Sequence, residues 1–252
     1  MEKRGTTITA FAIFFGLTLG AYLLGKSFER FRTDDRFISV KGFAEREVKA
    51  DLVIWSFKIR ITTNDLQEGN TSLETAVKKV NDFLIKNGIN TKEITQQSLA
   101  VTDKQANEYG GQNGNERYRY IIQQTIEVRS ANVDAVQRVS RMTSELLSAG
   151  VALSTGADYT GTGLRFIFTK LNDVKPAMLS EATKNARTAA EEFTKESQTH
   201  LGKMRKASQG LFSILDRDES LAGGGEGGYY ASGTSDLYKK IRVVISVEYA
   251  ID

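Results

Sequence analysis

An uncharged, apolar stretch near the N-terminus constrains this chain more than any other feature of its sequence. Residues 5–25 contain no charged side chain, and the segment ITAFAIFFGLTLGAYLL within them is strongly apolar. About 20 apolar residues in a helix cross the roughly 30 Å core of a bilayer. We therefore predict that residues 5–25 span a membrane as one helix, and that residues 1–32 are an anchor with a juxtamembrane segment.

A cleaved signal peptide has a similar basic start and apolar middle, so it is the alternative to a retained anchor. No A-x-A-like cleavage site follows the apolar stretch, because LLGKSFER leads directly into charged residues. This favours a retained anchor over a cleaved signal peptide. Basic residues lie on both sides of the span, so the positive-inside rule does not decide which side carries the rest of the chain.

The net charge of +3 belongs to the N-terminal segment alone. Residues 1–32 hold five basic and two acidic residues, which leaves the remaining 220 residues neutral overall. A nucleic-acid-binding domain carries a basic stripe on its folded part. The sequence shows none, and we expect no nucleic-acid partner.

The residue types that most often carry catalysis and metal binding are scarce. The chain has no Cys and a single His, His200. Disulfide frameworks, Cys nucleophiles and thiolate metal sites are excluded, and most His-based chemistry with them. We expect no catalytic, metal or cofactor-binding residues, and hence no enzyme.

The rest of the chain reads as alternating strands and amphipathic helices. The residues at 53, 55, 57, 59 and 61 are apolar, whereas those at 54, 56, 58 and 60 are expected to face water. The strands are predicted at 36–48, 52–62, 94–104, 117–130, 156–169, 206–216 and 239–251, and the helices at 65–87, 132–149 and 173–201. The order β-β-α-β-β-α-β-α-β-β predicts the α+β class, with antiparallel sheets covered by helices.

The third helix has a distinctive inner face. Pro176 is expected in its first turn, where its missing N–H costs nothing. Small side chains at Ala182, Ala186, Ala189 and Ala190, followed by Phe193, should let this helix lie close to a sheet.

Three segments of the chain together resemble one known family: ISVKGFAEREVKADLVIWSFKI, YIIQQTIEVRSANVDAVQRVSRMTSELLSAGV and LRFIFTKLNDVKPAMLSEATKNARTAAEEFTKESQTHLGKM. This is the SIMPL-domain family, which includes bacterial periplasmic immunogenic and oxidative-stress-defence proteins. The resemblance covers about 36–251. One departure is Ala50, which stands where the family usually has Pro before the turn residue Asp51. The resemblance implies that residues 33–252 form an exported α+β domain prone to homo-oligomeric assembly, with a division into two subdomains left open. It brings no catalytic residues.

Two local patterns resemble parts of known binding loops but lack the other residues that those loops require. The glycine-rich segment 223–228 lacks the Lys and Ser/Thr that open a helix after a phosphate-binding loop, so we interpret it as a linker or assembly loop. Asp216, Asp218 and Glu219 lack the pattern of a calcium-binding loop, and we interpret them as a solvated turn.

Several single residues are expected to have structural rather than functional roles. We expect His200 near the end of the long helix, where a cation complements the helix dipole. Trp55 and Phe57 are predicted to be core residues. Asn70-Thr71-Ser72 is a formal glycosylation acceptor without meaning in a bacterial protein.

Two functions are compatible with these observations. The first is a self-assembling structural protein of the bacterial envelope, linked to stress defence, anchored in the inner membrane by residues 5–25 and with its C-terminal domain in the periplasm. Its partners are lipid and further copies of itself, in a ring of more than two subunits contacting through loops 105–117 and 223–235. The alternative is an envelope enzyme or ligand-binding protein. We favour the first.

Overall fold

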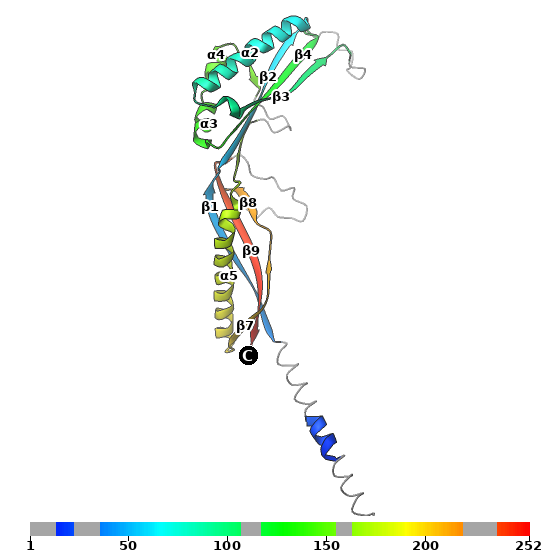
Figure 1. Cartoon of the computed structure of the whole chain (residues 1–252), viewed down its shortest axis with the longest axis vertical. Coiled ribbons are helices and arrows are strands. Elements are labelled where there is room, and N and C mark those ends of the chain that lie inside the picture. Colours follow the sequence, from blue (N-terminus) through cyan, green and yellow to red (C-terminus); the bar gives the residue numbers. More distant parts are fainter. Residues whose placement is uncertain (1–13, 23–35, 107–116, 155–162, 219–235) are drawn as a thin grey trace, which may run out of the picture. The chain divides into compact units, whose positions relative to one another are not determined.

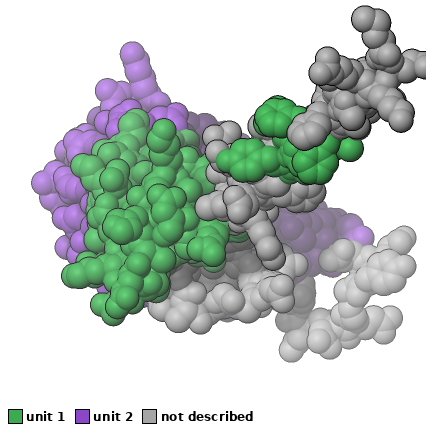
Figure 2. Space-filling model, turned by 90° about the horizontal axis from the view of Figure 1, so that it is seen from below, with its two compact units in different colours: residues 1–46, 174–213, 242–252 green, residues 47–173, 214–241 purple. Residues whose placement is uncertain are grey.

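The computed structural model describes residues 14–22, 36–106, 117–154, 163–218 and 236–252 (Figure 1). The chain divides into two compact units, which Figure 2 colours separately. Unit 1 contains residues 1–46, 174–213 and 242–252, and unit 2 contains residues 47–173 and 214–241. Both sheets contain antiparallel strand pairs, and helices pack on them, which confirms the α+β class.

Unit 2 is built around a five-stranded sheet. Its strands run in the order β3 (Ile94–Asp103), β4 (Tyr120–Ser130), β2 (Leu52–Thr63), with the short β5 (Leu153–Ser154) and β6 (Gly163–Ile167) both pairing with β2. Three helices accompany it: α2 (Leu66–Lys86), α3 (Val133–Ser140) and α4 (Ser144–Ser148), besides a 3₁₀ turn at Thr91–Glu93. Apolar side chains of these helices join those of β2 and β4 in one core.

The predicted register of β2 is confirmed on its core face. Trp55 and Phe57 are buried, with ring centroids 4.9 Å apart, and Trp55 lies opposite Val128 of β4. The opposite face was expected to be wet, but Ile54 and Ser56 are also buried. Because β2 is central, Ile54 is flanked on both sides, by Arg129 of β4 and Arg165 of β6. Long arginine side chains cover apolar neighbours with their aliphatic stems.

Unit 1 contains most of a second sheet and the long helix α5 (Leu171–Glu196). The strand order is β1 (Phe37–Lys49), β9 (Tyr238–Ile251), β7 (Leu201–Gln209), with β8 (Ser213–Asp216) also pairing with β9. The buried stripe of α5 is Met178, Ala182, Ala186, Ala190 and Thr194. Figure 1 shows α5 lying along this sheet.

A glycine allows α5 to approach the sheet closely. A Cβ at Gly42 of β1 would overlap the carbonyl oxygen of Ala182 and lie 2.6 Å from the backbone N of Ala186. The small inner face predicted for α5 is therefore confirmed. Phe193 was wrongly included in it: it lies one position off the four-residue stripe and is 61% exposed.

Both ends of α5 differ from the prediction. The helix begins at Leu171, so Pro176 lies beyond the first turn. It ends at Glu196 because Gln198 adopts a left-handed backbone conformation, with φ 55°, and the N–H of Thr199 donates back to the carbonyl of Thr194 at 2.9 Å. That six-residue closure is typical of helix termination.

Two further predicted elements are divided. The helix expected over 132–149 is interrupted between α3 and α4, where Arg141 and Met142 donate to carbonyls only three residues back. The strand expected over 206–216 starts earlier, as β7, and is separated from β8 at Gly210, whose N–H donates to the carbonyl of Val244 at 2.9 Å.

The predicted membrane span lies largely outside the described residues. Residues 14–22 are helical. Among the residues that the structure describes, no helix is both long enough and apolar enough to cross a membrane.

Candidate interaction surface

The surface with the clearest functional potential lies in unit 2, where α2 borders the edge strand β3. The helix starts at a capping residue, because the Asp65 carboxylate accepts from the N–H groups of Gln67 and Glu68 at 2.7 and 3.1 Å. Gly69 then keeps the first turn close to the sheet, since a Cβ there would lie 2.6 Å from side-chain atoms of Ile122 and Thr63. This contact fixes the line along which α2 crosses the strands.

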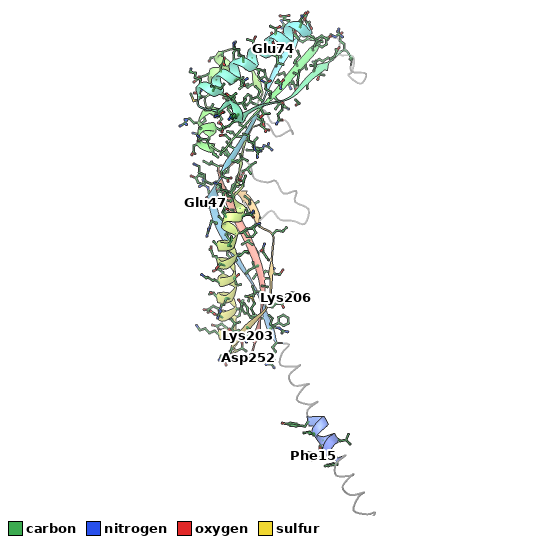
Figure 3. The ribbon with its side chains drawn as sticks, viewed as in Figure 1. Phe15, Glu47, Glu74, Lys203, Lys206 and Asp252 are labelled. Carbon is green, nitrogen blue, oxygen red and sulfur yellow. The ribbon has the colours of Figure 1, made fainter. Side chains whose placement is uncertain are left out.

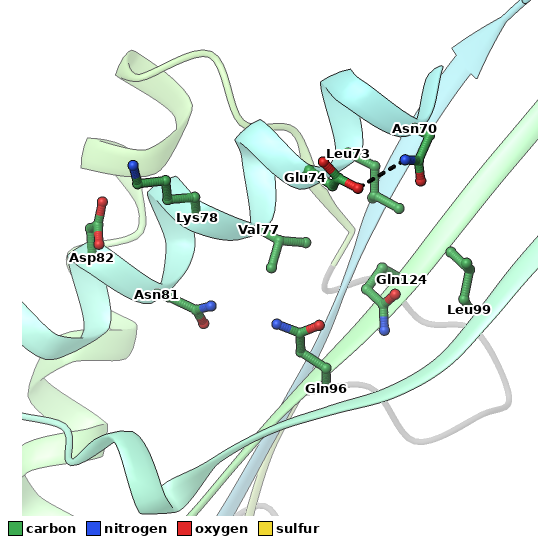
Figure 4. Close-up of a pocket in the computed structure, with 10 residues that line it drawn as sticks. All are labelled: Asn70, Leu73, Glu74, Val77, Lys78, Asn81, Asp82, Gln96, Leu99 and Gln124. Atoms are coloured by element: carbon green, nitrogen blue, oxygen red, sulfur yellow. Dashed lines mark hydrogen bonds between the residues drawn. The ribbon is translucent and has the colours of Figure 1, made fainter. Parts of the chain in front are cut away.

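An open groove of about 470 Å³ follows between α2 and the strands (Figure 4). Helix α2 supplies one wall, with residues spaced three and four apart: Asn70, Leu73, Glu74, Val77, Lys78 and Asn81. The strands supply Gln96, Leu99 and Gln124. The lining combines aliphatic side chains with four amide side chains, so it can satisfy both donors and acceptors of an occupant.

Two of the amide side chains that line the groove, those of Gln124 and Asn81, differ in their hydrogen bonding. The Gln124 side chain is buried and donates to the backbone carbonyl of Gln97 at 2.8 Å. The strand pairing of β3 with β4 shifts register between Gln96 and Leu99, so this side chain replaces a ladder bond lost at the bulge. The Oδ1 atom of Asn81 is buried and has no hydrogen-bond partner among the described residues. A buried polar atom without a partner is unfavourable, and an occupant that donates to it would remove that cost.

Among the residues that the structure describes, β3 pairs only with β4 and so forms one edge of this sheet. Eight consecutive residues of the strand are exposed, and among them Leu99 is 55% and Val101 50% exposed. An exposed edge strand presents unpaired backbone groups to which another strand can add.

An ion pair fixes the far end of β3 to β4. The Arg119 guanidinium donates to the Asp103 carboxylate at 2.8 and 3.2 Å. The hydrogen bond from Arg119 is the main cause that lowers the pKa of Asp103, and the same bond raises the pKa of Arg119. The arginine also lies 4.8 Å over the ring of Tyr120. This end of the edge is therefore held in place.

Within the acidic group at 216–219, Asp216 does not lie in a solvated turn but at the end of β8. Asp216 forms an ion pair with Lys239, whose side chain is 1% exposed. The prediction was wrong for this residue because its partner lies on β9, in a segment that looked independent. Asp218 is exposed, and Glu219 lies outside the described residues.

The other predicted positions have simpler outcomes. His200 is exposed and lies beyond the end of α5, where its carbonyl accepts from the N–H of Asp252 at 3.2 Å, so its assignment to the helix was wrong. Asn70, Thr71 and Ser72 belong to α2, and Asn70 donates to Glu74 at 2.9 Å.

Several predicted segments lie outside the described residues: 223–228, most of loop 105–117 and loop 223–235. Across the described ranges, no three acidic or His side chains form a cluster that could hold a metal ion.

Sequence analysis missed both the groove and the buried ion pair, although each left a signal. The strand ITQQSLAVTD lacks sustained alternation, which is typical of an edge strand without a buried face. Lys239 occupies a position two residues before Ile241 on the apolar face of β9. A lysine at such a position indicates a buried partner.

Comparison with known proteins shows the family of this chain. Residues 38–248 match the SIMPL family, which is described as a protein of unknown function (DUF541). No curated protein matches the chain. The resemblance seen in the sequence is confirmed over nearly the same range.

Proposed function

Because this chain belongs to the SIMPL family, we propose that it is a membrane-anchored protein that assembles with copies of itself into a structural element of the bacterial cell envelope. In this proposal residues 5–25 cross the inner membrane, the C-terminal part lies in the periplasm, and the protein contributes to envelope stress defence. It has no catalytic role.

The observation that carries self-assembly is the open edge of β3. Leu99 and Val101 are half exposed on a strand edge that pairs with no other described strand, and natural proteins usually protect such edges with charge, proline or covering elements. Across the eight exposed residues from Thr95 to Thr102 there is no charged side chain. Pairing with another copy removes both the exposed backbone groups and the exposed apolar area.

The geometry of pairing decides the size of the assembly. Two β3 edges that pair with each other form a two-fold contact, which closes at two subunits. A ring of more than two subunits requires β3 to meet a different surface of the next copy. A single anchor in each copy would confine the subunits to one plane and raise their local concentration.

Light scattering on the full-length protein in detergent tests assembly. We expect a particle of more than two subunits, and we expect Leu99→Lys to reduce its mass because a charge at the edge opposes strand addition. Leu147→Lys is the matched control, since Leu147 is an equally apolar, 69% exposed residue on α4. A monomeric wild-type protein overturns the proposal, and a dimer restricts it to the two-fold contact.

Protease treatment of spheroplasts tests the location. A periplasmic C-terminal part is digested while the inner membrane is intact. Protection of that part until the membrane is lysed would place it in the cytoplasm and contradict the proposal.

A ligand-binding function is the second candidate, because the unpartnered Oδ1 of Asn81 lies at the α2–β3 groove. Native mass spectrometry of protein extracted from its own membranes would then show an added mass. Asn81→Leu should remove that mass while leaving the assembly intact.

A further inference from the structure

We propose that the start of β7, around Lys203, Arg205 and Lys206, rests on anionic lipid headgroups at the surface of the membrane. This inference depends on the proposed anchoring of residues 5–25. It adds a second membrane contact, made by the folded part of unit 1.

The strands place this segment at the end of the sheet where the chain enters it. Leu201 of β7 lies opposite Ile251 of β9, and the N–H of Ile251 donates to the carbonyl of Arg36 at 3.3 Å. The start of β1, the end of β9 and the start of β7 therefore meet. Figure 3 shows Lys203 near Asp252 at this end, with Lys206 farther along β7.

The length of chain before β1 limits how far this end can lie from the predicted span. The span ends at Gly25 and β1 begins at Phe37, twelve residues later. Twelve residues reach at most about 40 Å when fully extended. Lys203 is only two residues into β7, so it lies near the point from which this connection starts.

The composition of the segment suits a charged lipid surface. Residues 203–206 read KMRK, and all four are exposed. Within the part of the chain that the structure describes, neither Lys203 nor Lys206 forms an ion pair, although Glu248 lies opposite Lys206 on β9. Basic side chains near an anionic bilayer are attracted over about one Debye length, roughly 8 Å at physiological salt.

Apolar groups accompany the charges. Phe37 is 51% and Met204 45% exposed, and the guanidinium of Arg205 lies 5.7 Å over the Phe37 ring. Basic groups together with an exposed aromatic ring are typical of surfaces that lie in the headgroup region. The sequence adds Lys26, Arg30 and Arg32 of the same sign in the connection itself.

The absence of cysteine in the natural chain makes a direct test possible, because a single introduced cysteine can be labelled specifically. The full-length Met204→Cys protein carries a fluorophore and is reconstituted into phosphatidylcholine vesicles, with or without phosphatidylglycerol. A headgroup spin-labelled lipid serves as the quencher. We expect quenching in the anionic vesicles that falls as salt is raised, and little quenching in the neutral vesicles.

Charge removal provides the matched comparison. Lys203→Gln with Lys206→Gln should abolish most of the quenching, whereas Lys86→Gln with Lys184→Gln removes the same charge from exposed positions on α2 and α5 and should leave it unchanged. A label at Leu211, which is 89% exposed beyond the end of β7, should be quenched much less. Equal quenching in neutral vesicles, or no response to the Lys203 and Lys206 substitutions, overturns the inference.

A carbonate wash separates this inference from the proposed anchor. Protein that is extracted by alkaline carbonate lacks the membrane-spanning anchor, and the proposed function fails. Protein that resists extraction but shows no quenching retains the anchor and contradicts only the lipid contact of β7.

Discussion

At the scale of single residues, Gly42 shows how one missing side chain sets the distance between a helix and a sheet. We predict that Gly42→Ala lowers the free energy of unfolding of unit 1 by about 1–3 kcal/mol, because the added methyl group would overlap the backbone of α5 at Ala182. Thermal unfolding followed by circular dichroism measures the loss. Ser39→Ala, on an exposed position of the same strand, should have little effect.

Lys239 is a buried charge that forms an ion pair with Asp216. We predict that Asp216→Ala destabilises unit 2 by about 3–5 kcal/mol, because it leaves the ammonium buried without its carboxylate. The double variant Lys239→Met with Asp216→Leu should recover most of that loss in chemical denaturation. If the single and the double variant lose the same free energy of unfolding, the ion pair itself stabilises the fold.

The pair of Asp103 and Arg119 predicts a pH dependence. The pKa of Asp103 is lowered by the hydrogen bond from Arg119, so the ion pair stabilises the fold above the ordinary pKa of an aspartate, about 3.9, and this contribution is lost as the pH falls through the lowered value. Carboxyl NMR titration should give a value below the ordinary one. Arg119→Gln should move the pKa of Asp103 toward the ordinary value, although the backbone N–H of Gln105 still donates to the carboxylate. Arg119→Lys should move it less.

At the scale of elements, the bulge in β3 is held by a side chain rather than by the backbone ladder. We predict that Gln124→Ala speeds amide exchange in the peptide 94–103 by about two- to tenfold, the effect of losing one hydrogen bond of about 0.5–1.5 kcal/mol. Hydrogen exchange with mass spectrometry measures this. Thr62→Ala, on an exposed position of β2, is the control, and unchanged exchange at β3 would show that the bulge holds without Gln124.

At the scale of the whole molecule, retention of the N-terminal segment decides whether this is a membrane protein. We predict that protein extracted from membranes begins at or near Met1, because residues 5–25 are uncharged and no cleavage site follows. Intact-mass measurement reports the N-terminus. A mature protein beginning between residues 27 and 37 would contradict the anchor.

The sequence by itself determined the elements whose signal is local. The alternation in β2 places Trp55 in the core, and the small residues at intervals of four in α5 mark its buried face. The helix predicted over 65–87 is α2, Leu66–Lys86. Each of these features depends on the geometry of one strand or one helix. The family match follows the same elements along the chain.

Contacts between residues distant in the sequence were decided only by the tertiary structure. In it, Asp216 forms an ion pair with Lys239, twenty-three residues away. Strand β3 becomes an edge strand, and a groove lies between β3 and α2. The tertiary structure also ended α5 at Glu196, just before Gln198 takes a left-handed conformation and the chain turns back into β7. The physical reason is that strand order and helix placement depend on contacts between distant residues, whereas periodicity reports only which face of an element is buried.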